Sequence, residues 1–167
     1  MTTANIHAAL TAPDSQANQA NQAEDAAAHA FIQRWQHNRA SELATAQSFV
    51  IELCELLGVD KPHATAAQNY MFERPVTFTY GDGTSSAGRI DCYRRGCFVL
   101  EAKKLKAAVH TKGFDDGLIR AHKQGENYIR ALPAAEGRPP FLLVVDVGNV
   151  IEVYAEFSKS GGAYRPF

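Results

Sequence analysis

The spacing of apolar residues predicts two amphipathic helices in the N-terminal third of the chain. Apolar side chains recur three and four positions apart from about 24 to 37 and again from about 41 to 57, as they do on one face of a helix. Gly58 follows the second repeat, where a helix commonly ends in a residue with positive φ. The side chains expected to face inward are Ala28, Phe31, Ile32 and Trp35 in the first helix, and Leu43, Ala46, Val50, Leu53, Cys54 and Leu57 in the second.

Strand patterns and one further helix pattern follow. Short apolar runs bounded by Gly, Pro and Asp predict five strands, at 74–80, 87–93, 97–103, 141–147 and about 150–157. A helix is expected from about 115 to 132, before Pro133, with Leu118, Ala121, Gly125, Tyr128, Ile129 and Leu132 facing inward. The order of two helices, three strands, a helix and two strands predicts an α/β domain with a mixed sheet of about five strands, the last strand at one edge.

Residues 1 to about 22 lack large apolar side chains and are rich in Ala, Thr, Asn and Gln, which is typical of a disordered tail. The folded domain is therefore expected to span residues 23–167, a length that suits one domain.

Charged side chains lie close together in the third predicted strand, at positions that we expect to be buried. Side chains alternate along a strand, so Glu101 and Lys103 project from one face and Ala102 from the other. Buried carboxylates are costly unless positive charge compensates them, and a divalent cation supplies that charge. The pattern favours a metal-dependent nuclease site, with a surface ladder of salt bridges as the alternative.

Asp91 on the preceding strand can join this site only if the hairpin has the right register. A three-residue loop, Arg94-Arg95-Gly96, would set Tyr93 opposite Cys97 and Asp91 opposite Val99, on the face of Glu101. A two-residue loop would instead turn Asp91 to the other face. The prediction therefore depends on the longer loop.

The composition of the chain argues against several classes of protein. Apolar residues make up 46% of the chain, and no segment approaches the roughly 20 apolar residues that span a membrane. The start lacks a secretion signal, so a cytoplasmic protein is expected. The cysteines number three, with no CxxC pair, which supports neither a disulfide framework nor a structural zinc site.

The net charge of −1 does not indicate a dedicated DNA-binding module, but the distribution of charge matters more. Lysine and arginine outnumber acids between residues 103 and 123, beside the predicted site. This strip could contact DNA phosphates, although each side chain could equally be solvated on a helix face. The candidate phosphate contacts are Lys104, Lys106, Arg120 and Lys123.

The helix after the third strand should pack over it. Gln124 and Tyr128 lie four residues apart and face the same way, with Arg120 one turn earlier. Tyr128 could be a core residue with its hydroxyl at the rim. Together with Glu101 and Lys103, the pair becomes a candidate for orienting a phosphate or the attacking water.

Taken in order, Asp91, Glu101-Ala102-Lys103 and Gln124-x-x-x-Tyr128 resemble the PD-(D/E)xK nuclease superfamily, and the last motif is similar to that of RecB-like members. A closer resemblance, over about residues 35–167, is to the N-terminal region of MmeI-like restriction-modification enzymes and of relatives described as adenine-specific DNA methyltransferases. The stretches that carry it are 70–76, 89–91, 100–103, 124–128 and 151–154. The chain departs from these patterns at Ile90, where the superfamily name has proline, and at Gly125, where relatives often have alanine.

The resemblance implies a restriction-endonuclease-like fold and a DNA endonuclease domain that depends on Mg²⁺, with Mn²⁺ as a substitute. It implies that Asp91, Glu101 and the backbone carbonyl of Ala102 hold the cation and that Lys103 positions and helps to deprotonate the attacking water. Gln124 and Tyr128 would assist. An additional acid, as some members have, could be Glu73, Glu42 or Glu55.

The chain lacks the glycine-rich S-adenosylmethionine loop and the Asn/Asp-Pro-Pro-aromatic motif of a methyltransferase. Arg138-Pro139-Pro140-Phe141 has arginine at the position that must hold the target amine. We therefore expect the nuclease portion of a longer polypeptide that acts on double-stranded DNA, with S-adenosylmethionine and target recognition assigned to downstream domains. The alternatives are a DNA-binding or scaffold module that no longer cuts, the nuclease end of a type I restriction motor subunit, and an interaction domain without a nucleic-acid role.

Overall fold

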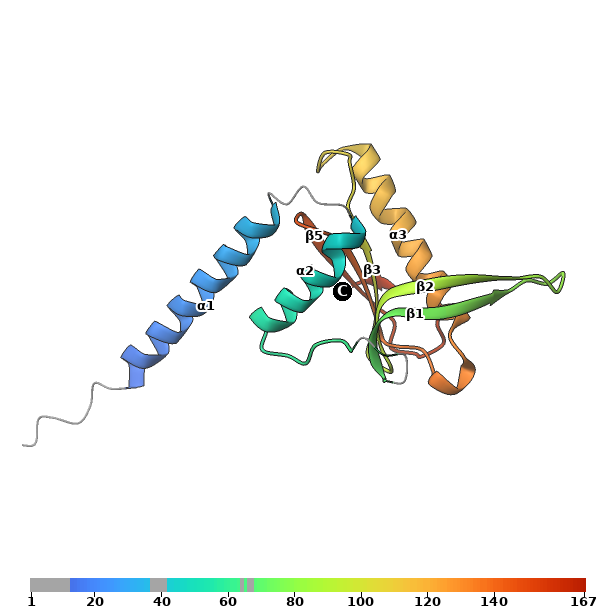
Figure 1. Cartoon of the computed structure of the whole chain (residues 1–167), viewed down its shortest axis with the longest axis horizontal. Coiled ribbons are helices and arrows are strands. Elements are labelled where there is room, and N and C mark those ends of the chain that lie inside the picture. Colours follow the sequence, from blue (N-terminus) through green and yellow to red (C-terminus); the bar gives the residue numbers. More distant parts are fainter. Residues whose placement is uncertain (1–12, 37–41, 64, 66–67) are drawn as a thin grey trace, which may run out of the picture.

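The computed structural model describes residues 13–36, 42–63, 65 and 68–167. These residues form a six-stranded sheet whose strands follow one another in chain order, with helices on both faces (Figure 1). The sheet is antiparallel except where β3 and β4 pair in parallel across the connecting helix α3. The helices are α1 (Pro13–Gln36), α2 (Glu42–Leu56) and α3 (Lys112–Ala131), and the strands are β1 (Tyr70–Thr79), β2 (Ser85–Arg94), β3 (Phe98–Lys103), β4 (Phe141–Asp146), β5 (Val150–Ala155) and β6 (Arg165–Pro166), with a 3₁₀ turn η1 (Ala134–Glu136) before β4.

The predicted mixed α/β sheet is thus confirmed, and it is compatible with a restriction-endonuclease-like fold. Strand β3 lies in the middle of the sheet, as expected for the strand that carries the acid-x-lysine triplet. The short strand β6 was not predicted, and it displaces β5 from the edge. None of the helices in the described ranges is long and apolar enough to cross a membrane.

Helix α3 covers one face of the sheet. The six residues that the spacing predicts to face inward are all buried, the last of them, Leu132, just past the end of the helix, and Phe114 and Gly117 are buried as well. Its first turn is capped by the Thr111 side chain, which accepts a hydrogen bond from the Phe114 backbone amide. Gly125 permits close approach to the sheet, because a Cβ there would lie 2.4 Å from Leu142 Cδ1 on β4. The buried residues on this side form one core cluster, here called the α3 cluster.

Helices α1 and α2 cover the opposite face around Trp35, Phe49 and Val50, which form the α2 cluster together with residues of β2, β3 and β4. Two predicted core residues are wrong: the side chains of Ile32 and Leu57 are 46% and 63% exposed. Ile32 lines a surface pocket beside β5, and Leu57 lies in the turn just past the last residue of α2. The predicted inward residue Leu43 lies outside the described side chains.

Helix α1 begins at Pro13, about ten residues before the predicted start. The described part of the segment expected to be disordered is therefore helical, while residues 1–12 lie outside the described residues. Ala, Gln and Glu favour helix even where no apolar face is buried, so the helix extends beyond the part that contacts α2.

The β1–β2 hairpin twists strongly where the two candidate acids Glu73 and Asp91 lie. Phe72 pairs with Cys92, and both pack in the α2 cluster. Two residues further along, Ile90 pairs with Arg74 but packs in the α3 cluster, although alternation alone would keep it on the side of Cys92. Glu73 has φ of +53°, an uncommon value for a residue with a side chain. The hairpin therefore rotates about this point and projects from the body (Figure 1).

Candidate active site at the end of strand β3

The β2–β3 register differs from the predicted one by two positions. Tyr93 pairs with Val99 and Arg94 with Phe98, so the loop is Arg95-Gly96-Cys97, and the predicted pairs of Tyr93 with Cys97 and Asp91 with Val99 are wrong. Arg94 is kept in the strand because it pairs with Tyr70 and its guanidinium lies 5.0 Å from the centre of that ring.

The loop still has three residues, and a shift of two positions does not change which face a side chain starts from. Continuing the observed register by one residue sets Asp91 level with Glu101.

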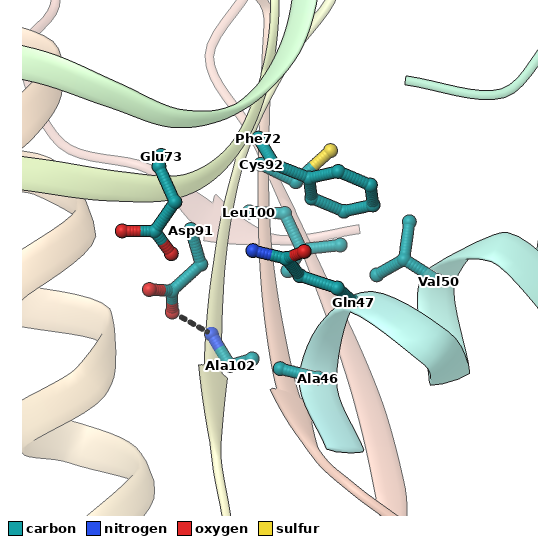
Figure 2. A pocket seen from close by; sticks show the side chains of 9 residues that line it. All are labelled: Ala46, Gln47, Val50, Phe72, Glu73, Asp91, Cys92, Leu100 and Ala102. Atoms are coloured by element: carbon teal, nitrogen blue, oxygen red, sulfur yellow. Dashed lines mark hydrogen bonds between the residues drawn. The ribbon is translucent and has the colours of Figure 1, made fainter. Parts of the chain in front are cut away.

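Asp91 is fixed against the strand that carries the triplet. Its carboxylate accepts a hydrogen bond of 2.7 Å from the backbone amide of Ala102, across the gap where β2 and β3 separate (Figure 2). The neighbouring residue Cys92 is fully buried, and burial, followed by the charges of Cys54 and Asp91, raises the pKa of its thiol. The bond between Asp91 and Ala102 connects the acid of one strand to the backbone beside Glu101.

Glu101 and Lys103 form an ion pair on the α3 side of β3. Lys103 Nζ donates to Glu101 Oε1 at 2.6 Å, and the two side chains are 22% and 1% exposed. The other oxygen, Oε2, is buried and accepts no hydrogen bond from the described residues. Alternation explains the placement, because Val99 lies in the α3 cluster while Leu100 and Ala102 lie in the α2 cluster. Lys103 supplies the positive charge that offsets the burial of this carboxylate.

Of the three candidate additional acids, the structure brings Glu73 to the site. Glu73 and Asp91 line the same cavity, and Figure 2 shows their carboxylates side by side at one end of it. The partner of Glu73 is Arg89, at 3.7 Å, and the arginine side chain is 72% exposed. Glu55 instead pairs with Lys61 at 2.5 Å on the surface, and the side chain of Glu42 lies outside the described residues.

Gln124 and Tyr128 contact each other, since Gln124 Nε2 donates to the Tyr128 hydroxyl at 2.9 Å. The Tyr128 ring is buried, stacks on Phe78 of β1 at 5.8 Å and lies close above Gly88. Tyr128 is thus a core residue with its hydroxyl held by Gln124. Both belong to the helix that covers the face from which Glu101 projects, but the part they play at the site stays a prediction.

The candidate phosphate contacts lie beyond the end of β3 and on the outer surface of α3. Lys106, Arg120 and Lys123 are exposed, and Lys104 is half-buried. Their exposure agrees with a surface that could meet a polyanion, and it agrees equally with a solvated face.

Asp146 is a buried acid that sequence reasoning missed. It is fully buried at the end of β4, level with Lys103 on the adjacent strand. Its carboxylate accepts hydrogen bonds from the Leu105 backbone amide at 2.6 Å and from the Asn149 side chain at 2.5 Å. Asp146 therefore holds the chain that leaves β3 directly after Lys103. An acid ending an apolar run beside the triplet strand was the signal that could have revealed it.

The donor groups here suit a hard divalent cation. Asp91, Glu101 and the Ala102 carbonyl offer oxygen ligands only, and Mg²⁺ is typically held by one or two carboxylates while it keeps several waters. No group of three or more His, Cys, Asp or Glu side chains in the described part of the chain is arranged to hold a metal ion. The oxygen groups named above are therefore the ligands that the described residues offer, without an all-protein cage.

Fold and site together define an α/β domain with a central strand that ends in a buried acid–lysine pair. A family model for the N-terminal domain of MmeI matches residues 20–166. The chain belongs to this family, whose members are domains of restriction-modification proteins. Searches of curated proteins and of solved structures found no significant match.

Proposed function

We propose that this domain is a Mg²⁺-dependent endonuclease that hydrolyses phosphodiester bonds of double-stranded DNA within a restriction-modification or phage-defence protein. The observation that carries the proposal is the hydrogen bond between Asp91 and the Ala102 amide, together with the buried Glu101–Lys103 pair. These contacts gather two acids and one lysine at the point where two central strands separate. Membership of the MmeI N-terminal domain family supports the restriction-modification context.

Asp91, Glu101 and the Ala102 carbonyl would hold Mg²⁺, and Mn²⁺ could replace it. Glu73 is the best additional acid because it borders the same cavity as Asp91. When bound, Mg²⁺ supplies positive charge that offsets the negative charge developing on the phosphoryl and leaving 3′ oxygens.

Lys103 would position the attacking water and favour its deprotonation, because the ammonium group held beside Glu101 would stabilise the hydroxide that forms. Gln124 would hold the Tyr128 hydroxyl in a fixed direction. The exposed bases Lys106, Arg120 and Lys123, with Lys104, would contact phosphates along the duplex. S-adenosylmethionine and base recognition would belong to other domains of the same polypeptide.

A cleavage assay tests the proposal. Supercoiled plasmid is incubated with Mg²⁺ and either the wild-type protein, Asp91→Asn or Lys103→Met, with Asp82→Asn at the exposed hairpin turn as the control. We expect nicking by the wild type and the control and loss of at least roughly 100-fold in the two site variants. Equal activity in all four proteins would mean that a contaminant cuts or that the site lies elsewhere.

If the wild type binds DNA and yet cuts nothing within its full-length protein, the second candidate, a restriction-endonuclease-like module that only binds DNA, is favoured. The intact acid–lysine pair speaks against that candidate, because a buried carboxylate is costly to keep without a role.

A further inference from the structure

A cavity of about 160 Å³ opens between α2 and the strands β1, β2 and β3 (Figure 2). One end is apolar, and the other is bordered by the Glu73 and Asp91 carboxylates and by Ala102. The cavity therefore leads from the surface beside α2 to the proposed site. The apolar residues that line it are Ala46, Val50, Phe72, Cys92 and Leu100.

Gln47 is the polar side chain that α2 contributes to this cavity, since the other α2 residues there are Ala46 and Val50. Figure 2 shows its amide pointing from α2 into the cavity, toward the end where Asp91 and Ala102 lie. A primary amide offers two hydrogen-bond donors and one acceptor and carries no charge. The described part of helix α2 thus presents a neutral donor to the site where sequence analysis expected an additional acid.

Gln47 and Lys103 lie on different sides of strand β3, and this placement determines which part of a bound phosphate each could contact. Lys103 projects from the face of β3 that α3 covers, whereas Ala102 packs in the cluster on the α2 face. Gln47 and Lys103 therefore reach the Asp91–Ala102 region from opposite sides of the strand. The attacking water would be held on the Lys103 side of the strand. The non-bridging oxygens of the scissile phosphate that point away from this water would then face helix α2.

We infer that Gln47 is a substrate-contacting residue, whose Nε2 donates a hydrogen bond to a non-bridging oxygen of the scissile phosphate. This inference rests on the proposed function. A neutral donor strengthens its bond as negative charge grows on the phosphoryl oxygen, and it does not compete with the cation held by the neighbouring acids. A glutamate in its place would repel the phosphate and attract the cation.

Two charge variants on the same helix turn test whether Gln47 faces the cation site. Gln47→Glu and Ser48→Glu add the same charge at adjacent positions that are both exposed, but Gln47 borders the cavity and Ser48 does not. Calorimetric titration with Mn²⁺ should show tighter binding to Gln47→Glu by roughly 10-fold, because a carboxylate at the end of the cavity would lie near the ion. Ser48→Glu should stay within about twofold of the wild type, since a carboxylate outside the cavity lies farther from the ion and is screened by solvent.

Gln47→Ala tests the phosphate contact. Its affinity for Mn²⁺ should match that of the wild type within about twofold, while single-turnover cleavage of plasmid DNA slows by roughly 10- to 100-fold, the range for losing one neutral donor to a developing charge. The Michaelis constant for DNA should change little, because the bond is strongest in the transition state. Ser48→Ala is the matched control and should cleave like the wild type.

Equal Mn²⁺ affinity in Gln47→Glu and Ser48→Glu would overturn the inference while leaving the proposed nuclease intact. A Gln47→Ala variant that cleaves at the wild-type rate, or that is slow because it no longer binds Mn²⁺, would also overturn it. If neither the wild type nor Gln47→Glu binds Mn²⁺, both the proposed function and this inference fail.

Discussion

Lys103 should stabilise the fold as well as serve the site, because it compensates the charge of a carboxylate that is almost completely buried in the central strand. The Glu101 side chain is 1% exposed, and Lys103 Nζ lies 2.6 Å from its Oε1. Lys103→Met keeps the length and the apolar stem of the side chain and removes only the ammonium group. The variant therefore leaves a buried carboxylate without this cation.

Breaking a buried ion pair from one side costs about 3–5 kcal/mol, and partial exposure of the lysine reduces the loss to about 2–3 kcal/mol. The Lys103 side chain is 22% exposed, so the lower range applies. For a chain of 167 residues, a loss of this size lowers the melting temperature by roughly 4–12 °C. Thermal unfolding followed by circular dichroism measures it, with Lys106→Met at an exposed position as the control.

The same variant should gain more stability from Mn²⁺ than the wild type does, because a bound cation replaces the missing charge beside Glu101. Glu101→Gln in the Lys103→Met background should recover part of the lost stability, since the uncompensated charge is removed. A Lys103→Met variant as stable as Lys106→Met would refute the reasoning, and so would an equal response of both variants to Mn²⁺.

Two further predictions concern the scaffold. Gly148→Ala should destabilise the fold by at least about 3 kcal/mol, because Gly148 has φ of +90° and a Cβ there would lie 2.3 Å from the Trp35 carbonyl oxygen. In urea unfolding, Gly81→Ala, which meets open space, should change little, and equal loss in both would contradict the packing argument. Burial raises the pKa of Tyr164 from 10.0 to about 12, so its contribution to stability is complete below pH 10 and is lost as the pH rises toward 12. Tyr164→Phe should flatten the loss of stability between pH 10 and 12, and an unchanged pH profile would show that this phenol does not titrate with unfolding.

The spacing of apolar residues predicted the buried positions correctly where a helix packs along the sheet. Every inward residue of α3 expected from the spacing of three and four is buried, because that helix lies along the sheet for its whole length. In contrast, Ile32 and Leu57 fit the helical pattern but are exposed, since Ile32 lines a surface pocket beside β5 and Leu57 lies past the end of α2. A one-dimensional pattern gives the direction of a side chain and does not give the extent of the surface opposite it.

The hairpin shows which register errors change the face of a side chain. The loop Arg95-Gly96-Cys97 differs from the predicted one by two residues, and an even shift keeps each side chain of the ladder on the face expected for it. The approach of Glu73 could not be derived in this way. It depends on a residue with positive φ and on a twist of the hairpin that alternation does not describe.

Gln47 and Asp146 were missed for a different reason. Gln47 is a polar residue on a helix whose expected role is to bury apolar groups, and its importance depends on the depth of a cavity between distant segments. Asp146 lies opposite Lys103 only because β3 and β4 pair in parallel across α3. The local sequence shows Asp146 as an acid at the end of an apolar run, but it does not show which distant segment that acid contacts.

The most direct test of the central claim is calorimetric titration of Mn²⁺ into the wild-type domain, Asp91→Ala and Glu101→Ala. The structure connects Asp91 to the strand of Glu101 through the Ala102 amide, so both acids should contribute to one binding event. We expect binding near one ion per chain in the wild type and at least roughly 10-fold weaker binding in each variant. Absence of binding to the wild type, or binding that neither substitution weakens, would contradict a metal-dependent site at the end of β3.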